Sequence, residues 1–118
     1  NADKKTLSEV AAISKELVAK AREGRLTRQD MTGGTFTVTN LGMHDVDVFI
    51  PIINPPETAI LGVGRVVEKP VAVDGHVAVR PRMQLSLAYD HRIVDGAPAA
   101  EFLKTVKKML ETGSFTDS

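Results

Sequence analysis

The chain has 118 residues, with 15 Lys and Arg against 15 Asp and Glu, three His and no Cys. This length allows one domain with its own core, and the balanced charge leaves no basic excess to bind a nucleic-acid backbone. The lack of cysteine excludes disulfides, thiolate zinc sites, iron–sulfur clusters and a cysteine nucleophile. No apolar run approaches the ~20 residues of a membrane-spanning helix, so we expect neither a nucleic-acid nor a membrane partner. Because the chain begins with Asn1, we expect a processed or excised piece of a longer protein.

A helix is predicted over residues 7–23. Thr6 and Glu9 match a capping box, in which a hydroxyl and a Glu three residues later satisfy the first free backbone amides. Gly24 is predicted to end the helix, and Thr27 to open a short turn. An apolar stripe at near-helical spacing indicates the buried face: Leu7, Val10, Ile13, Leu17 and Ala21.

Two stretches in the middle of the chain predict strands. Residues 35–40 alternate, so that Phe36 and Val38 face one way and the threonines face the other. Residues 58–67 form a nearly continuous, β-branched apolar run, which predicts a central strand buried on both faces. Gly62 and Gly64 within that run indicate a close approach of another backbone segment.

A hairpin and a last strand follow. Asp74-Gly75 is a strong two-residue turn signal between residues 71–73 and 76–79. Residues 83–89 alternate again and predict another strand. A helix is predicted over residues 97–112 from its apolar stripe. These elements predict a two-layer α/β fold, or the C-terminal half of one, with helices packed on a mixed sheet.

His91 differs from the other two histidines in its position. His44 and His76 lie in turn-like or hairpin contexts that suit exposed polar residues, and no second ligand stands at metal-binding spacing, so no metal site is expected. His91 directly follows a strand and precedes a turn and a helix. Side chains at such strand ends project into clefts in α/β proteins.

The neighbours of His91 leave two interpretations open. A histidine acting as a base needs a partner that fixes its tautomer, and Asp95 could orient the ring, orient the loop or cap the last helix. In the alternative, Asp90, Arg92 and Asp95 exchange hydrogen bonds in a purely structural loop. Residue types alone favour a functional role only modestly.

Residues 90–96, Asp-His-Arg-Ile-Val-Asp-Gly, resemble the His-x-x-x-Asp-Gly motif of the dihydrolipoamide acyltransferases. These proteins are core components of 2-oxo acid dehydrogenase complexes and are similar in fold to chloramphenicol acetyltransferase. The resemblance extends from about residue 2 to residue 111. Further matching segments occur in the family's order: residues 33–42, 53–57, 59–64 and 100–103. The resemblance implies that residues 1–118 form the C-terminal part of an acyltransferase catalytic domain with a chloramphenicol acetyltransferase-like fold.

The resemblance also implies the chemistry and its residues. The family transfers acyl groups between dihydrolipoamide and coenzyme A, a substrate, while the lipoyl group is carried on a separate domain. His91 matches the general base, Thr39 the hydroxyl that stabilises the oxyanion, and Asp95 a residue that orients the loop. Phe49 and Tyr89 are expected to line the thiol channels.

The resemblance further implies partners, and alternatives remain. The family's site lies between subunits of a trimer, so His91 and Thr39 would meet across an interface, and the complex adds the lipoyl domain, the decarboxylase and dihydrolipoamide dehydrogenase. The expected location is the cytoplasm, or the mitochondrial matrix in a eukaryote. Because the family's domain is longer, we expect an upstream half before Asn1 and little activity from this chain alone. The acyl group stays open between acetyl, succinyl and branched-chain. Two rivals are an acyltransferase of the same fold acting on a hydroxyl or amine, and a non-catalytic structural core or binding component.

Overall fold

The computed structural model describes residues 1–113, which divide into two units. One unit comprises Asn1–Gly34 and the chain from Thr105 on; the other comprises Thr35–Lys104. No helix within the described residues is long and apolar enough to cross a membrane. The elements in chain order are η1 (Ala2–Lys4), α1 (Leu7–Arg22), β1 (Thr37–Asn40), η2 (Gly42–His44), β2 (Ala59–Val63), β3 (Val67–Val73), β4 (His76–Arg82), β5 (Leu85–Tyr89) and α2 (Gly96–Thr112).

Helix α1 begins and ends where local signals predict. The Thr6 hydroxyl accepts a hydrogen bond from the Glu9 amide at 3.3 Å, and the Glu9 carboxylate accepts one from the Thr6 amide at 2.8 Å. This confirms the capping box, which satisfies amides that have no partner inside the helix. The helix ends at Arg22, one residue before the predicted end, and Gly24 follows with φ 65°.

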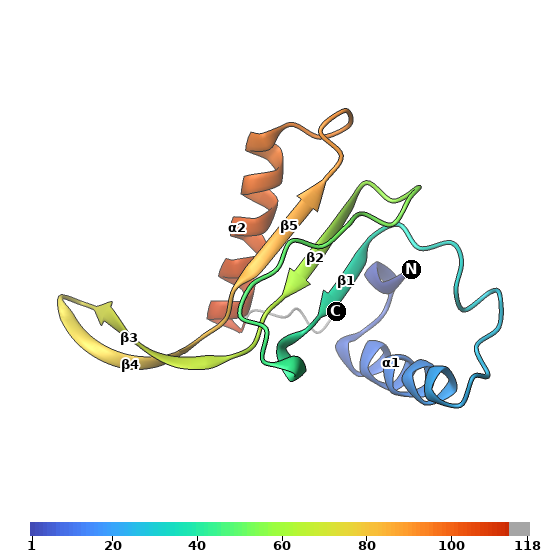
Figure 1. The fold of residues 1–118 in the computed structure, drawn as a ribbon, viewed down its shortest axis with the longest axis horizontal. Coiled ribbons are helices and arrows are strands. Elements are labelled where there is room, and N and C mark those ends of the chain that lie inside the picture. Colours follow the sequence, from blue (N-terminus) through green and yellow to red (C-terminus); the bar gives the residue numbers. More distant parts are fainter. Residues whose placement is uncertain (114–118) are drawn as a thin grey trace. The chain divides into compact units, whose positions relative to one another are not determined.

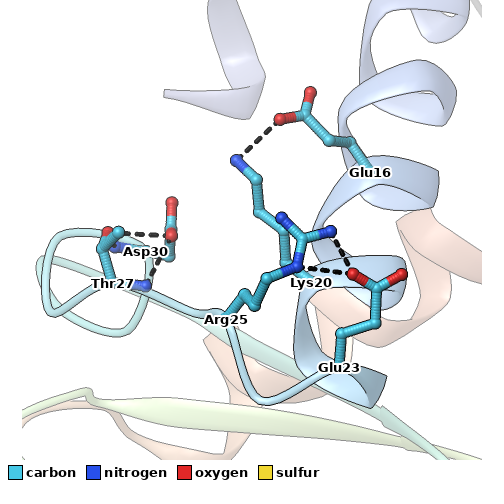
Figure 2. Close-up of polar contacts among 6 residues, drawn as sticks. All are labelled: Glu16, Lys20, Glu23, Arg25, Thr27 and Asp30. Carbon is cyan, nitrogen blue, oxygen red and sulfur yellow. Dashed lines mark hydrogen bonds and ion pairs between the residues drawn. The ribbon is translucent and has the colours of Figure 1, made fainter.

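The turn after α1 is opened by Thr27, as predicted (Figure 2). Its amide and hydroxyl both donate to Asp30 Oδ2 at 2.8 Å, and the Asp30 amide donates back to Thr27 Oγ1 at 3.3 Å. These two donors stabilise the carboxylate and lower the pKa of Asp30. Two ion pairs lie on the surface of the same region: Lys20 with Glu16, and Arg25 with Glu23.

The second unit contains a three-stranded mixed sheet in the order β1-β2-β5 (Figure 1). Strand β1 runs parallel to β2, and β2 antiparallel to β5, so the predicted mixed sheet is confirmed. The register places Thr39 opposite Gly62, and Gly62 opposite Ser86. Directly paired residues share a face of the sheet, so these three positions line one face, while Leu61 belongs to the other.

Residues 96–104 of helix α2, the part within this unit, lie on the face that carries Leu61. The rings of Phe36 and Phe102 lie 5.6 Å apart, and Ala99 is only 5% exposed. Strand β1 begins two residues later than predicted, and within it the predicted alternation is correct. Val38 nevertheless remains 63% exposed, whereas Thr39 on the opposite face is half-buried. Within β1, the side chains of Thr37 and Thr39 are therefore less exposed than that of Val38.

The predicted strand over residues 58–67 is wrong in its second half. Strand β2 ends at Val63, and residues 64–66 belong to no strand. The Arg65 amide donates to the Val46 carbonyl at 2.9 Å, outside the sheet ladder, and the chain then enters the hairpin. A contact with a segment about 20 residues upstream therefore decides where the strand stops.

The β3-β4 hairpin forms at the predicted turn. Asp74 and Gly75 both have positive φ, 50° and 80°, which is the geometry of a two-residue type I′ turn. The paired strands are longer than predicted, running from the Val67–Arg82 pair to the Val73–His76 pair. Strand β5 begins at Leu85, two residues later than expected.

Few apolar side chains are buried within residues 1–113. The buried apolar core consists of Ile60, Leu61 and Ala99. An exposed apolar row instead runs along the segment before β2, where Val48, Ile50 and Ile52 are 57%, 87% and 89% exposed. Exposed apolar side chains that gather on one segment make that segment a candidate for contact with another protein.

We predict that the 118-residue chain associates in solution and that Ile50→Ser with Ile52→Ser weakens this association at least about tenfold, because each buried isoleucine contributes ~1.5–3 kcal/mol. Sedimentation velocity over a concentration series measures the change. Val77→Ser with Val79→Ser, on the exposed hairpin, is the matched control. Equal effects of the two pairs would show that the row has no special role.

Candidate functional site

His91 lies on a tight turn directly after β5. The Asp90 amide donates to the Thr58 carbonyl at 2.9 Å. Because Thr58 directly precedes β2, this hydrogen bond continues the antiparallel pairing of β5 with β2 by one residue. The amides of Ile93 and Val94 then both donate to the Asp90 carbonyl at 3.0 Å and close the turn. His91 stands on the outside of this turn with its side chain 71% exposed. Its ring is therefore accessible to a reactant.

The Asp90 side chain holds this turn together. Its carboxylate accepts from the Arg92 amide and Nε at 2.9 Å each, and from Nη2 at 2.6 Å. The guanidinium and the amide together stabilise the ionised form and lower the pKa of Asp90 to about 2. This part of the structural-loop interpretation is correct: Asp90 and Arg92 are bonded to each other.

Asp95 lies against His91 rather than in the Asp90–Arg92 pair. Its Oδ1 is 4.0 Å from His91 Nδ1, beyond hydrogen-bond length but near enough to attract a protonated ring. Its carbonyl accepts from the Ala99 amide at 3.2 Å in the first turn of α2. The Tyr89 ring lies 5.7 Å from the His91 ring, tilted by 39°. The structure thus brings His91, Asp95 and Tyr89 together.

Thr39 and Phe49 form a second group. Gly62 lies opposite Thr39 on β2, and a Cβ added there would come within 3.0 Å of Phe49 Cζ, so the Phe49 ring covers the glycine. On the same face, the Thr37 hydroxyl donates to Glu57 Oε2 at 2.5 Å. Among the described residues, no hydrogen bond engages the Thr39 hydroxyl. That hydroxyl is therefore available to donate to another group.

The two groups do not meet within one chain. Thr39 belongs to one outer strand, β1, and His91 follows the other outer strand, β5. Two strand spacings of ~4.8 Å, and at least three residues of ~3.3 Å along β5, place them more than ~12 Å apart. Groups that act on the same reacting atoms need to lie within about 3 Å of them. Within one copy, Thr39 and His91 are therefore too far apart to act on the same atoms.

The remaining candidates lie outside both groups. His44 and His76 are exposed, at the end of η2 and the start of β4. No cluster of three potential metal ligands occurs within residues 1–113. Asn54 closes a turn by accepting from the Glu57 amide at 3.0 Å, around a cis peptide bond between Pro55 and Pro56.

Sequence analysis missed Arg65. Its Nε donates to Asp47, and its Nη1 to Asp45 Oδ1 at 3.3 Å. The guanidinium stabilises the ionised carboxylate and lowers the pKa of Asp47. The partners lie 18 and 20 residues away in sequence, so no local spacing signals this contact.

Comparison with known proteins places the chain in a family. A family model described as 2-oxoacid dehydrogenases acyltransferase (catalytic domain) matches residues 1–115. The chain therefore belongs to the 2-oxoacid dehydrogenase acyltransferase family.

Similar proteins carry acyltransferase names. The chain is 47% identical, over 92% of its length, to the dihydrolipoyllysine-residue succinyltransferase component of the 2-oxoglutarate dehydrogenase complex of Haemophilus influenzae, and spans 27% of that protein. It is 51% identical, over 86% of its length, to the mitochondrial counterpart from Saccharomyces cerevisiae, and spans 23% of it. All of the chain superimposes on 50% of a probable dihydrolipoamide acetyltransferase from Listeria monocytogenes, with a TM-score of 0.92 and 42% identity. The chain thus spans about a quarter of these relatives and half of the solved structure.

We predict that Asp90→Asn lowers the melting temperature by a few °C at pH 7, and that most of this effect has disappeared at pH 2. Because the pKa of Asp90 is depressed, the stability from its ionised form is fully present above the unfolded-state pKa near 4 and is lost as the pH falls toward about 2. Thermal unfolding between pH 2 and pH 7 tests this, with Asp3→Asn as a control on the exposed η1 turn. A difference from the wild type that does not change with pH would contradict the assignment.

Proposed function

We propose that this chain is the C-terminal part of the catalytic domain of an acyltransferase that moves an acyl group between dihydrolipoamide and coenzyme A in a 2-oxo acid dehydrogenase complex. The observation that carries the proposal is an exposed His91 with Asp95 at 4.0 Å, on a turn fixed by Asp90, in a chain of this family. The match to half of the Listeria monocytogenes chain supports a partial catalytic domain.

His91 acts as the general base in this proposal. A thiol has an ordinary pKa near 8.5, so only a minority is thiolate at neutral pH. The neutral imidazole takes the proton from the coenzyme A thiol as its sulfur attacks the thioester carbonyl carbon. Asp95 stabilises the imidazolium that forms, because it lies close enough for charge attraction.

Thr39 stabilises the intermediate. Attack forms a new carbon–sulfur bond and moves the carbonyl electrons onto oxygen, and the Thr39 hydroxyl, which has no partner among the described residues, donates to that oxyanion. Collapse re-forms the carbonyl and breaks the bond to the dihydrolipoyl sulfur. That sulfur takes the proton from His91, which returns the imidazole to its neutral form.

Two copies of the chain complete one site. Separation by more than ~12 Å prevents Thr39 and His91 of the same copy from acting on one carbonyl, so His91 of one copy works with Thr39 of a neighbour in a trimer. Phe49 beside Thr39 and Tyr89 beside His91 then line the approaches of the two thiols. The lipoyl group arrives on its own domain, and the decarboxylase and dihydrolipoamide dehydrogenase complete the complex. The bacterial and mitochondrial relatives support a location of the protein in the bacterial cytoplasm or in the mitochondrial matrix.

A non-catalytic core component is the second candidate. The separation of Thr39 from His91 and the exposed row at Val48, Ile50 and Ile52 would suit a chain that only assembles. The acyl group stays open, because the relatives include both succinyl and acetyl transferases. An acyltransferase of the same fold that acts on hydroxyls or amines would be distinguished by the acceptor to which it transfers the acyl group.

We predict that His91→Ala in the full-length protein lowers the rate of acyl transfer from acyl-CoA to dihydrolipoamide by about 10²–10⁴-fold, the usual contribution of a general base. His76→Ala, at an exposed position on the hairpin, is the matched control and should retain the wild-type rate. Near-normal turnover in His91→Ala would exclude the base. If the wild-type protein transfers no acyl group to dihydrolipoamide or to any other acceptor, the result would favour the non-catalytic core component. If it transfers the acyl group to a hydroxyl or an amine instead, the result would favour the acyltransferase that acts on those acceptors.

We predict that Thr39→Val lowers kcat by about 10²–10³-fold, as the loss of one oxyanion donor does, while Thr39→Ser keeps most of it. The loss should fall on kcat and on kcat/KM equally, because the donated bond exists only when charge develops on oxygen. Steady-state kinetics of both variants measure this. Equal turnover of the Val and Ser variants would make Thr39 an ordinary strand residue.

A further inference from the structure

Residues 45–51, here called the crossing segment, pass over the face of β2 that Thr39 shares. A Cβ on Gly64 would collide with the Asp47 carbonyl oxygen, and one on Gly62 would lie 3.0 Å from Phe49 Cζ and 3.3 Å from Pro51 Cδ. Gly62 in β2 and Gly64 just after it therefore leave room for the crossing segment. The predicted close approach of another backbone segment is thus confirmed at Gly64, whereas the atoms closest to Gly62 belong to the side chains of Phe49 and Pro51.

Arg65 holds the start of the crossing segment with its main chain and its side chain. Its amide donates to the Val46 carbonyl at 2.9 Å, and its guanidinium bonds the carboxylates of Asp47 and Asp45. The Arg65 side chain is 37% exposed and that of Asp47 44%, so these ion pairs lie in contact with water. Such pairs contribute little to the free energy of unfolding. Their main effect is to fix where the segment lies.

The fixed segment determines the surroundings of Thr39. Phe49 is two residues after Asp47, and its ring covers Gly62, the direct strand partner of Thr39 about 4.8 Å away. The aromatic ring thus lies on the face of the sheet that Thr39 shares, over the neighbouring strand. A donor stabilises an oxyanion most strongly where water is excluded. A shift of the Phe49 ring would admit water to this position.

We propose that Arg65 is a positioning residue for acyl transfer: by bonding Asp47 and Asp45 it holds the Phe49 ring over Gly62, and so keeps water away from the Thr39 hydroxyl. This inference rests on the proposed function. It assigns two consequences to Arg65: a faster chemical step, and protection of the acyl thioester from hydrolysis in the site. Neither consequence requires Arg65 to touch a substrate.

The test uses the full-length protein with Arg65→Met, which keeps an apolar stem of similar length, and Arg65→Lys, which keeps the charge. We expect Arg65→Met to lower kcat about tenfold and to leave KM for both substrates within about twofold, because a misplacement near 1 Å costs up to ~10² in rate. Release of free coenzyme A from acyl-CoA without dihydrolipoamide should rise several-fold relative to transfer. Arg65→Lys should give intermediate values.

Three controls make the outcome decisive. Arg80→Met alters an exposed arginine on β4, whose Nη1 donates to the adjacent Val79 carbonyl at 3.1 Å, and should change none of these quantities. Asp47→Ala, which removes the acceptor, should reproduce Arg65→Met, and the double variant should lose no more than either single one, because the two residues act as a unit. Thermal unfolding and sedimentation of each variant identify any loss of folding or assembly.

Different results would overturn the positioning role of Arg65 and the proposed acyl-transfer function. Wild-type kcat and hydrolysis in a folded Arg65→Met protein would overturn the positioning role alone, as would a loss that appears only in KM. The positioning role would also be overturned if Arg65→Met lost activity while Asp47→Ala kept the wild-type kcat. A wild-type protein that transfers no acyl group to dihydrolipoamide would overturn the proposed function itself.

Discussion

The close approach of the crossing segment to β2 is the constraint on which the second unit depends. A side chain at Gly64 would require the Asp47 backbone to move, and backbone cannot yield as a flexible side chain does. Because Gly62 and Gly64 carry no Cβ, one face of β2 receives the crossing segment while α2 covers the other. Strand β2 is thereby buried on both faces, although its regular part is only five residues long.

Two ion pairs serve the same geometric purpose at different strand ends. Arg92 binds Asp90 where the chain leaves β5, and Arg65 binds Asp47 shortly after the chain leaves β2. Each arginine fixes an irregular segment that has no sheet ladder to hold it. Partly exposed ion pairs of this kind contribute little to the free energy of unfolding. Their main effect is to fix where neighbouring side chains lie: His91 beside the first pair, and Phe49 near the second.

Features that depend on neighbouring residues could be predicted from the sequence, and features that depend on distant ones could not. The capping box at Thr6 and the turn at Asp74-Gly75 involve residues at most three apart, and both are confirmed. The end of β2 is set by a bond between Arg65 and Val46, and no pattern within residues 58–67 contains that information. At the candidate site, the His91–Asp95 contact follows from a four-residue spacing. The separation of His91 from Thr39 is expected only from the family resemblance, and its physical basis, the sheet register, appears only in the structure.

The register also links assembly to chemistry. A strand position is fixed by its ladder to well within one residue, so Thr39 cannot slide toward His91 without unpairing β1 from β2 and exposing a buried strand. If the proposed transfer takes place, the only route that keeps the sheet intact brings a second copy's His91 to Thr39. Dissociation of the copies would then abolish catalysis as completely as removal of the base. Every catalytic residue would still be present, but Thr39 of one copy and His91 of another would no longer hold one thioester between them.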